Sequence, residues 1–373
     1  MKYYIIAGEA SGDLHGSNLM RELKRQDAGA TFRFWGGDRM LAQGGELVKH
    51  INELAFMGFW EVLINLRTIL RNIKLCKKDL LEWKPDVLVL IDYPGFNLRM
   101  AEFAKKHGMK VVYYISPQIW AWKQSRVKKI RRDVDKMLVI LPFEQAFYKR
   151  FGVEVEFPGH PLLDAISEFE QGSSREQFLT ENGLSEKPIV ALLPGSRKQE
   201  LAATLKVMAS VVDSFPSYQF VVAGVKGHPA EYYQGLIKGT KVKLVFGQTY
   251  RLLAHAEAAL VTSGTATLET ALFGVPQAVC YRAGRVSYLI AKRLIKVKYI
   301  SLVNLIMERP LVREMIQYDF NSNDLKKELQ RLLHDRAYVE QIKAGYQELR
   351  QKLGGAGASK KAAEIIVKFL TTN

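Results

Sequence analysis

Two segments in the second half of the chain share a pattern that strongly limits the possible folds. In residues 192–198 (LLPGSRK) and 261–269 (VTSGTATLE), an apolar run ends in small and hydroxyl-bearing residues. This pattern is typical of a buried strand that leads through a short loop into a helix. The N–H groups at such a helix start carry partial positive charge and bind anions. One glycine-rich loop is commonly a plain turn, but the pair, with Arg197 in the first loop, predicts a nucleotide-diphosphate site.

Short apolar runs alternate with amphipathic stretches along the whole chain. This alternation predicts parallel sheets covered by helices on both faces. A chain of 373 residues exceeds the size of one usual core, so we expect two doubly wound, Rossmann-like α/β domains. Runs of strand type occur at residues 3–7, 32–35, 87–91, 111–115 and 136–141, and again at 189–193, 219–223, 243–246, 258–261 and 277–280.

The segment 157–163 (FPGHPLL), followed by the polar stretch 168–186, predicts the boundary between the domains. We expect an N-terminal domain of residues 1–165 and a C-terminal domain of residues 166–353, facing each other across a cleft. Ligands bind at the carboxyl ends of the strands in such sheets. A final amphipathic helix, 358–371, should pack back on the N-terminal domain. The other expected helices cover residues 16–26, 70–82, 97–107, 199–215, 250–256, 268–273 and 324–352.

The formal net charge of +16 indicates an anionic partner, such as a phosphorylated substrate, anionic lipid or nucleic acid. We expect no nucleic acid, because the chain has no helix-turn-helix, zinc-finger or RNP-type motif. Cys76 and Cys280 lack the spacing of a disulfide framework or metal site and should be reduced. The N-terminus has no signal-peptide pattern, and no run reaches the ~18 apolar residues of a transmembrane helix, so we expect a cytoplasmic protein.

Two carboxylates in loops of the first domain are candidate catalytic groups. Asp92 follows the strand at 87–91 and precedes a Pro-Gly pair. In that position it can act as a general base, or it can simply cap a turn. Glu9 follows the first strand and a glycine, and it has no comparable local role. A hydrogen bond to a substrate, or a catalytic one, is therefore expected for Glu9.

Other residues of these loops have competing structural explanations. Asp13 has the type and position to cap a helix that begins near Leu14. Ser11 and Gly12 would let the backbone approach a ligand, although a tight turn needs similar residues. We interpret His160 as a residue of the interdomain linker that lines the cleft. No H-x-x-x-H motif or acidic cluster indicates a metal site, and no cofactor is expected.

The second domain offers an arginine, an amide and a row of small donors. Arg197 can bind phosphate oxygens as a fork, or it can pair with Glu200 on the surface. Glu269 lies early in the expected helix, where the helix dipole alone favours an acid. Asn304 lies in an apolar stretch, so it is either a buried hydrogen-bonding residue or a site residue. The expected diphosphate donors are Ser263, Gly264, Thr265 and Thr267.

These motifs closely resemble those of the lipid-A-disaccharide synthase family, whose members are inverting glycosyltransferases with the two-domain GT-B architecture. The sequences GEASGD, SPQIWAW and VNLI are specific to that family, whereas SGT-x-x-LE is shared with other sugar-nucleotide transferases. The resemblance covers nearly the whole chain. Its matching segments, in order, are 8–13, 91–97, 116–122, 141–144, 159–164, 193–197, 263–269 and 303–306.

The resemblance implies that UDP-2,3-diacylglucosamine is joined to 2,3-diacylglucosamine 1-phosphate on the cytoplasmic face of the inner membrane, with release of UDP. It implies Asp92, Glu9 and Arg197 as catalytic residues. The chain departs from the family pattern at Tyr93 and Gly95, where we expect alanine and aspartate, which leaves Asp92 as the stronger base candidate. The substrate-binding residues that it implies are Ser11, Gly12, Asp13, Asn97, Gln118, Ser196, Ser263, Gly264, Thr265, Thr267, Glu269, which would hold the ribose, and Asn304.

The stretch 54–83 mixes aromatic and aliphatic residues with Arg67, Arg71, Lys74, Lys77 and Lys78. This composition favours either an interfacial helix on anionic lipid or packing against the first sheet. A diacylated substrate favours the membrane. Competing functions are another GT-B protein, such as a peptidoglycan N-acetylglucosaminyltransferase or a UDP-sugar epimerase, and a non-catalytic basic binding protein. The oligomeric state is left open, a homodimer included.

Overall fold

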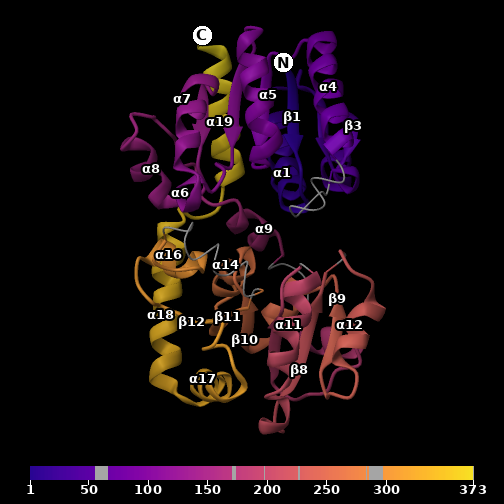
Figure 1. Ribbon diagram of the computed structural model, residues 1–373, viewed down its shortest axis with the longest axis vertical. Coiled ribbons are helices and arrows are strands. Elements are labelled where there is room, and N and C mark those ends of the chain that lie inside the picture. Colours follow the sequence, from indigo (N-terminus) through magenta and orange to yellow (C-terminus); the bar gives the residue numbers. More distant parts are fainter. Residues whose placement is uncertain are drawn as a thin grey trace. The chain divides into compact units, whose positions relative to one another are not determined.

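The computed structural model describes residues 1–54, 66–169, 174–196, 198–225, 227–282, 284 and 297–372. The described strands form two six-stranded sheets in which every strand pair is parallel (Figure 1). The chain divides into two compact units, Met1–Asp164 with Leu353–Asn373 (unit 1) and Ala165–Lys352 (unit 2), each with one sheet. The predicted fold class, two doubly wound α/β domains, is confirmed.

The sheet of unit 1 has the strand order β3-β2-β1-β4-β5-β6. Strand β4 is buried along its whole length, and β1 and β5 are buried except at their first residue, as expected for a parallel sheet covered on both faces. The order reverses between β1 and β4, and ligands bind at the carboxyl ends of the strands at such a switch point. The strands are β1 (Lys2–Ala7), β2 (Thr31–Gly36), β3 (Glu46–His50), β4 (Val87–Ile91), β5 (Lys110–Tyr114) and β6 (Lys136–Leu138).

A buried polar network ties one covering helix of unit 1 to its sheet. The Tyr4 hydroxyl donates to the Asp79 carboxylate at 2.6 Å and accepts from Trp35 Nε1 at 2.9 Å. Arg33 binds the same carboxylate through two nitrogens. Since both partners of each bond are satisfied, burial of these groups carries little penalty. The helices of unit 1 are α1 (Ala10–Gln26), α2 (Asp38–Leu41), α4 (Leu66–Trp83), α5 (Pro94–Lys106), α6 (Ile119–Trp122), α7 (Val127–Asp133), α8 (Pro142–Lys149) and α19 (Ala358–Thr371), with 3-10 turns η1 (Ile51–Glu53) and η2 (Gln124–Arg126).

The last helix, α19, belongs to unit 1 and packs beside α1 (Figure 1). Its residues Ala362, Ala363 and Ile366 join the buried apolar cluster of the first sheet. The Asp164 carboxylate accepts N–H groups from Gly357, at 2.6 Å, and from the first two residues of the helix. A carboxylate at a helix N-terminus satisfies donors that the helix leaves unpaired. The sequence pattern placed the domain boundary near residue 165; in the structure the chain leaves unit 1 after Asp164 and re-enters it at Leu353.

Unit 2 repeats the topology, with the strand order β12-β11-β10-β7-β8-β9. Helix α9 (Leu162–Phe169) joins the two units. The strands are β7 (Ile189–Leu193), β8 (Gln219–Gly224), β9 (Lys243–Phe246), β10 (Ala256–Thr262), β11 (Gln277–Tyr281) and β12 (Arg313–Ile316). The described helices are α10 (Arg175–Glu181), α11 (Lys198–Ala209), α12 (Ala230–Ile237), α13 (Thr249–Ala254), α14 (Thr265–Leu272), α16 (Leu302–Met307), α17 (Ser322–His334) and α18 (Arg336–Lys352), with the 3-10 turn η3 (Val212–Ser214).

The sequence pattern missed one edge strand in each sheet, β3 and β12. Both have mostly half-exposed side chains, so neither carries the continuous apolar run of a central strand. The helix expected at 324–352 is two helices, α17 and α18, which meet at Asp335 in extended conformation. Both cysteines are buried and free. Among the described residues, no helix has both the length and the apolar character needed to span a bilayer.

Candidate active site

The loop after β4 holds Asp92 in an unusual backbone conformation. Asp92 and Tyr93 have φ values of 43° and 48°, in the left-handed region that non-glycine residues seldom adopt. Each such residue costs about 1–3 kcal/mol, so neighbouring groups must hold it in place. The Asp92 carbonyl oxygen accepts hydrogen bonds from the Tyr113 hydroxyl at 2.5 Å and from the Asn97 side-chain nitrogen at 2.7 Å. These bonds explain how the strained turn persists.

The environment of the Asp92 side chain suits a general base. Burial raises the pKa of this carboxyl to about 7, and the negative charge of Glu9 adds to the rise, while a hydrogen bond from the Tyr93 backbone opposes it. A carboxyl with a pKa near the working pH combines a useful ionised fraction with strong affinity for a proton. Perturbed carboxyls of this kind are concentrated at functional sites.

Glu9 lies on the loop after β1, beside the Asp92 loop. It is the N-cap residue of α1, its side chain is exposed, and it makes no capping hydrogen bond. The two loops are in close contact, because a Cβ atom added to Gly8 would lie 2.4 Å from Tyr93 Cγ. Only glycine permits this approach. The sequence-based candidates Glu9 and Asp92 therefore meet at the switch point of the first sheet.

Three residues assigned to substrate binding on sequence grounds have structural roles instead. Asp13 does not cap a helix near Leu14, since α1 begins at Ala10; its buried carboxylate accepts backbone N–H groups around α2, that of Gly37 at 2.7 Å among them. Gly12 is buried, and a Cβ atom there would lie 3.1 Å from the Cβ of Ala7, so it allows α1 to pack on β1. Asn97 is fully buried and donates to backbone carbonyls of β1 and of the Asp92 turn.

Ser11 and Gln118 lie at the surface of this edge. Ser11 is exposed in the first turn of α1, and Gln118 is the exposed N-cap residue of α6. A hydrogen bond to α8 holds the segment that follows Gln118 in place. Trp120 Nε1 donates to the Glu144 carboxylate at 3.2 Å, and burial raises the pKa of that carboxyl to about 7. The match of 141–144 to the family pattern thus has a structural reason.

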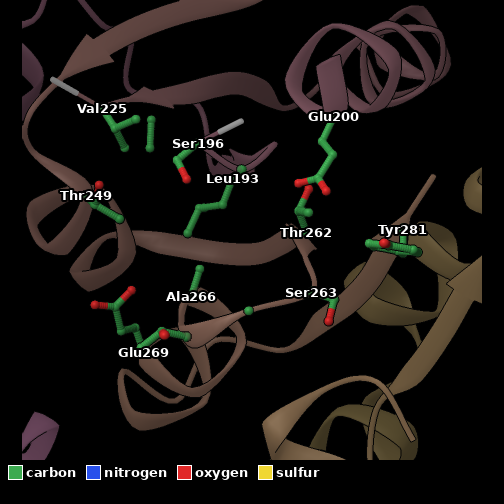
Figure 2. Close-up of a pocket in the computed structure, with 14 residues that line it drawn as sticks. Leu193, Ser196, Glu200, Val225, Thr249, Thr262, Ser263, Ala266, Glu269 and Tyr281 are labelled. Carbon is green, nitrogen blue, oxygen red and sulfur yellow. The ribbon is translucent and has the colours of Figure 1, made fainter. Parts of the chain in front are cut away.

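Unit 2 contains a pocket of about 360 Å³ at the carboxyl ends of β7 and β10 (Figure 2). Its floor includes Gly195, with a φ of 93°, and Gly264, with a φ of 155° and a ψ of −164°. Both conformations are open mainly to glycine. Helix α14 begins directly after Gly264, so its first N–H groups lie at the pocket. Of the sequence-based candidates, Ser196, Ser263, Gly264, Thr265 and Glu269 line the pocket.

Glu269 is the one carboxylate among those candidates. It accepts a hydrogen bond from the Tyr250 hydroxyl at 2.9 Å, and burial raises its pKa. Figure 2 shows its side chain among the residues that line the pocket. A carboxylate on the wall of a concave site can accept hydrogen bonds from paired hydroxyl groups. Its position is thus compatible with the ribose contact that the resemblance implied.

Three assignments in unit 2 are wrong in part or in full. Thr267 is completely buried, and its hydroxyl donates to the Gly264 carbonyl at 2.8 Å, so it offers no donor to the pocket. The Ser263 hydroxyl donates to the Ile300 carbonyl at 2.8 Å. Asn304 is buried and exchanges hydrogen bonds with the Val312 backbone at 2.8 and 3.0 Å. Asn304 was expected to be either a buried hydrogen-bonding residue or a site residue, and these bonds favour the first alternative. Arg197 lies outside the described residues.

The pocket also contains residues that sequence reasoning did not assign to it. Glu200 lines the pocket, and in Figure 2 its side chain points toward Thr262; on sequence grounds it was only a partner for Arg197. Val225, Thr249 and Tyr281 follow or end other strands of the sheet. Their loops carry no motif, so only the rule that ligands bind at strand carboxyl ends could have indicated them.

The remaining sequence-based predictions concern metal sites and His160. No group of three or more His, Cys, Asp or Glu side chains suited to a metal ion occurs in the part of the chain that the structure describes. His160 is buried, and burial lowers its pKa to about 3. Its Nδ1 accepts the Leu162 N–H at 3.2 Å. A neutral, enclosed imidazole with a local partner has a structural role within unit 1, so the expectation that His160 is an exposed linker residue is wrong.

Similarity to solved structures bears on the fold. A UDP-GlcNAc 2-epimerase from Neisseria meningitidis, bound to UDP-GlcNAc, matches over 100% of both chains with a TM-score of 0.70 at 13% identity. The glycotransferase of kitacinnamycin matches over 98% of both chains with a TM-score of 0.64 at 14% identity. At such low identity these matches show the fold alone, which is the two-domain GT-B architecture.

Similarity in sequence is much stronger and narrower. The lipid-A-disaccharide synthase of Geobacter metallireducens is 39% identical over 379 residues, covering 98% of this chain and 96% of the relative. Residues 3–369 match the family described as lipid-A-disaccharide synthetase. The motifs on which the resemblance rested are distributed over both units. The chain therefore belongs to the lipid-A-disaccharide synthase family.

Proposed function

We propose that the protein is an inverting glycosyltransferase of lipid A biosynthesis. It joins UDP-2,3-diacylglucosamine to 2,3-diacylglucosamine 1-phosphate, forming the lipid A disaccharide 1-phosphate and UDP. The observation that carries the proposal is the half-buried Asp92 carboxyl, with a pKa of about 7, on a strained turn at the switch point of unit 1. Family membership supports the choice of substrates.

We assign the nucleotide of the donor to the pocket of unit 2. Its glycine loops let the backbone approach a diphosphate, and the N-terminus of α14 offers N–H groups to an anion. The Glu269 carboxylate, oriented by Tyr250, is placed to accept hydrogen bonds from the ribose hydroxyls. Arg197, next to Ser196 in the sequence, adds a cation to the same loop. These groups stabilise the charge that develops on the departing UDP.

We assign activation of the acceptor to Asp92 in unit 1. The Asp92 carboxylate takes the proton of the acceptor hydroxyl while that oxygen forms a bond to the anomeric carbon of the donor sugar. The bond from this carbon to the diphosphate oxygen breaks, and its electron pair leaves with UDP. Attack from the face opposite the leaving group inverts the anomeric configuration. Glu9 acts in this scheme by raising the pKa of Asp92 and by hydrogen bonding to the acceptor.

We further propose that the protein works at an anionic membrane surface, where its lipid substrates reside. Helix α4 buries one face, including Ile73, Cys76 and Leu80, so part of the stretch 54–83 does pack in the core. The helix also exposes Leu66, Leu70, Leu75 and Leu81, each by 41–49%. Exposed basic residues, among them Arg67, Arg71 and Lys74, lie on the same helix. Apolar side chains beside cations suit the interface of an anionic bilayer. Residues 55–65 lie outside the described part of the chain.

The test is an assay of UDP release and disaccharide formation with both lipid substrates in detergent micelles. We expect UDP release only when an acceptor sugar is present, and a product with inverted anomeric configuration. A UDP-sugar epimerase would instead convert the donor without an acceptor and without releasing the sugar. Turnover of the donor that is independent of the acceptor would therefore contradict the proposal.

A further inference from the structure

A cationic, aromatic surface lies directly beyond the loop that follows β5. Trp122, the last residue of α6, is 50% exposed. The Lys123 Nζ atom lies 4.4 Å from the centroid of this indole ring, and the Arg126 Cζ atom lies 5.7 Å from it. The proposed mechanism gives none of these three side chains a role. They form the Trp122 platform.

Within the part of the chain that the structure describes, the two cations of the platform have no carboxylate partner. Among the described residues, neither Lys123 nor Arg126 lies within 4.0 Å of an Asp or Glu oxygen, whereas Arg132, further along α7, pairs with Asp133 at 2.7 Å. Every charged residue from Lys123 to Arg132 is basic. Two uncompensated charges that converge on one ring suit a dianion such as a phosphate monoester.

The platform follows an anchored helix and belongs to the same sheet edge as Asp92. Helix α6 is held by the hydrogen bond from Trp120 to Glu144 and by an edge-on contact of Trp120 with Phe143 at 4.9 Å. Arg126 is half-buried. Burial raises the pKa of the Tyr113 phenol, whose hydroxyl holds the Asp92 carbonyl, and the charge of Arg126 opposes part of that rise. A guanidinium within electrostatic range of that hydroxyl lies near the Asp92 turn.

We propose that Trp122, Lys123 and Arg126 form the subsite for the phosphate group of the acceptor sugar. The inference rests on the proposed function, which places the acceptor in unit 1. Arg126 binds two phosphate oxygens as a fork, Lys123 adds a second charge, and the indole packs against the apolar part of the bound lipid. The subsite thereby selects acceptors that carry a phosphate.

The test couples a change in the protein to a change in the substrate. Wild type, Arg126→Gln and Lys123→Gln are assayed in detergent micelles with 2,3-diacylglucosamine 1-phosphate and with the same sugar lacking its phosphate. We expect Arg126→Gln to raise the KM for the phosphorylated acceptor about tenfold or more, and Lys123→Gln to raise it by a smaller factor. With the acceptor that lacks phosphate, wild type should already be impaired, and neither variant should lose more.

Lys128→Gln is the matched control, because Lys128 is an exposed cation of the same run, and the cations over the Trp122 ring among the described residues are Lys123 and Arg126. It should behave as wild type, and all variants should bind UDP and melt as wild type does. Equal losses with both acceptors would overturn the subsite. A loss that appears only on phosphatidylglycerol vesicles, for both acceptors, would assign the cations to lipid headgroups and also overturn it. If wild type releases no UDP with either acceptor, the proposed function fails instead.

Discussion

The two units share a strand order but use left-handed backbone differently at their ligand edges. In unit 1, the residues with positive φ after β4 and β5 are Asp92, Tyr93 and Ile115, which all carry side chains. In unit 2, the residues with positive φ in the loops after β7 and β10, which line the pocket, are Gly195 and Gly264. Glycine adopts these conformations with little strain, whereas other residues need support from neighbours.

This difference matches the chemistry assigned to each edge. A diphosphate is bound well by backbone N–H groups, so unit 2 needs open backbone and small residues. The proposed general base must keep one orientation, and in unit 1 Tyr113 and Asn97 hold the strained turn that carries it. In the proposed mechanism, the same topology therefore binds the diphosphate in unit 2 and orients the base in unit 1.

The substitution Asp92→Asn should have the largest effect, and it tests the base assigned to unit 1. We expect kcat to fall by at least about 100-fold, because an amide cannot take the acceptor proton. UDP binding, measured by calorimetry, should remain at the wild-type value, since the pocket lies in unit 2. Near-normal turnover would disprove the base assignment and make Glu9 the next candidate.

Gly264→Ala tests the other edge. The space around Gly264 is open, so the added methyl group meets nothing, and the cost comes from the φ of 155° alone. We expect the loop to shift and UDP affinity to fall about tenfold. Gly239→Ala is the matched control, with a φ of 79° and equally open space outside the pocket. It should lower stability but leave UDP affinity unchanged; equal losses of affinity would mean that general destabilisation explains both.

The pH dependence of kcat/KM tests the base assigned to the edge of unit 1. Asp92 must be ionised to act as base, so kcat/KM should rise with pH through about 7, the pKa of its carboxyl. In Glu9→Gln, the removed negative charge no longer raises that pKa, and the acidic limb should move to lower pH. Relative to its own plateau, the variant should be roughly twofold to threefold more active at pH 6. If the acidic limb does not move, the charge of Glu9 does not contribute to the pKa of Asp92.

Membrane binding should depend on unit 1 alone. Changing Leu70 and Leu75 to Ser removes exposed apolar surface from α4 and should weaken co-sedimentation with phosphatidylglycerol vesicles about tenfold at high salt. High salt screens the cations, since the Debye length is about 3 Å at 1 M, and isolates the apolar contribution. Leu81→Ser, an exposed leucine near the end of the helix, serves as a comparison. Unchanged sedimentation, with UDP binding intact, would assign α4 to another surface.

The smallest expected effect is that of EDTA. The proposal keeps the departing diphosphate on N–H donors and cations of the chain, so activity should stay within about twofold of the untreated enzyme. A metal-dependent enzyme would lose activity fully and regain it with added Mg²⁺ or Mn²⁺. That result would show that the edge of unit 2 needs an ion in addition to its backbone donors.

Much of the site could be predicted because its loops interrupt strong periodic patterns. The strands β4 and β7 begin and end where the apolar runs do, and the loops after them carry Asp92 and Gly195. Edge strands and helix ends were harder to predict. Strand β3 has half-exposed residues without an apolar run, and α1 begins at Ala10, six residues before the helix expected from residue 16.

The sequence by itself determined the fold class, the family and the loops to which we assign the proposed chemistry, because apolar periodicity and local motifs are readable along the chain. Tertiary structure alone decided what individual polar residues do. The Asp13 carboxylate accepts a hydrogen bond from the Gly37 N–H, and the Asn304 side chain exchanges hydrogen bonds with the Val312 backbone. The raised pKa of Asp92 arises from burial and from Glu9, more than eighty positions away in sequence. Hydrogen-bond partners and desolvation depend on proximity in space, and no local pattern encodes them.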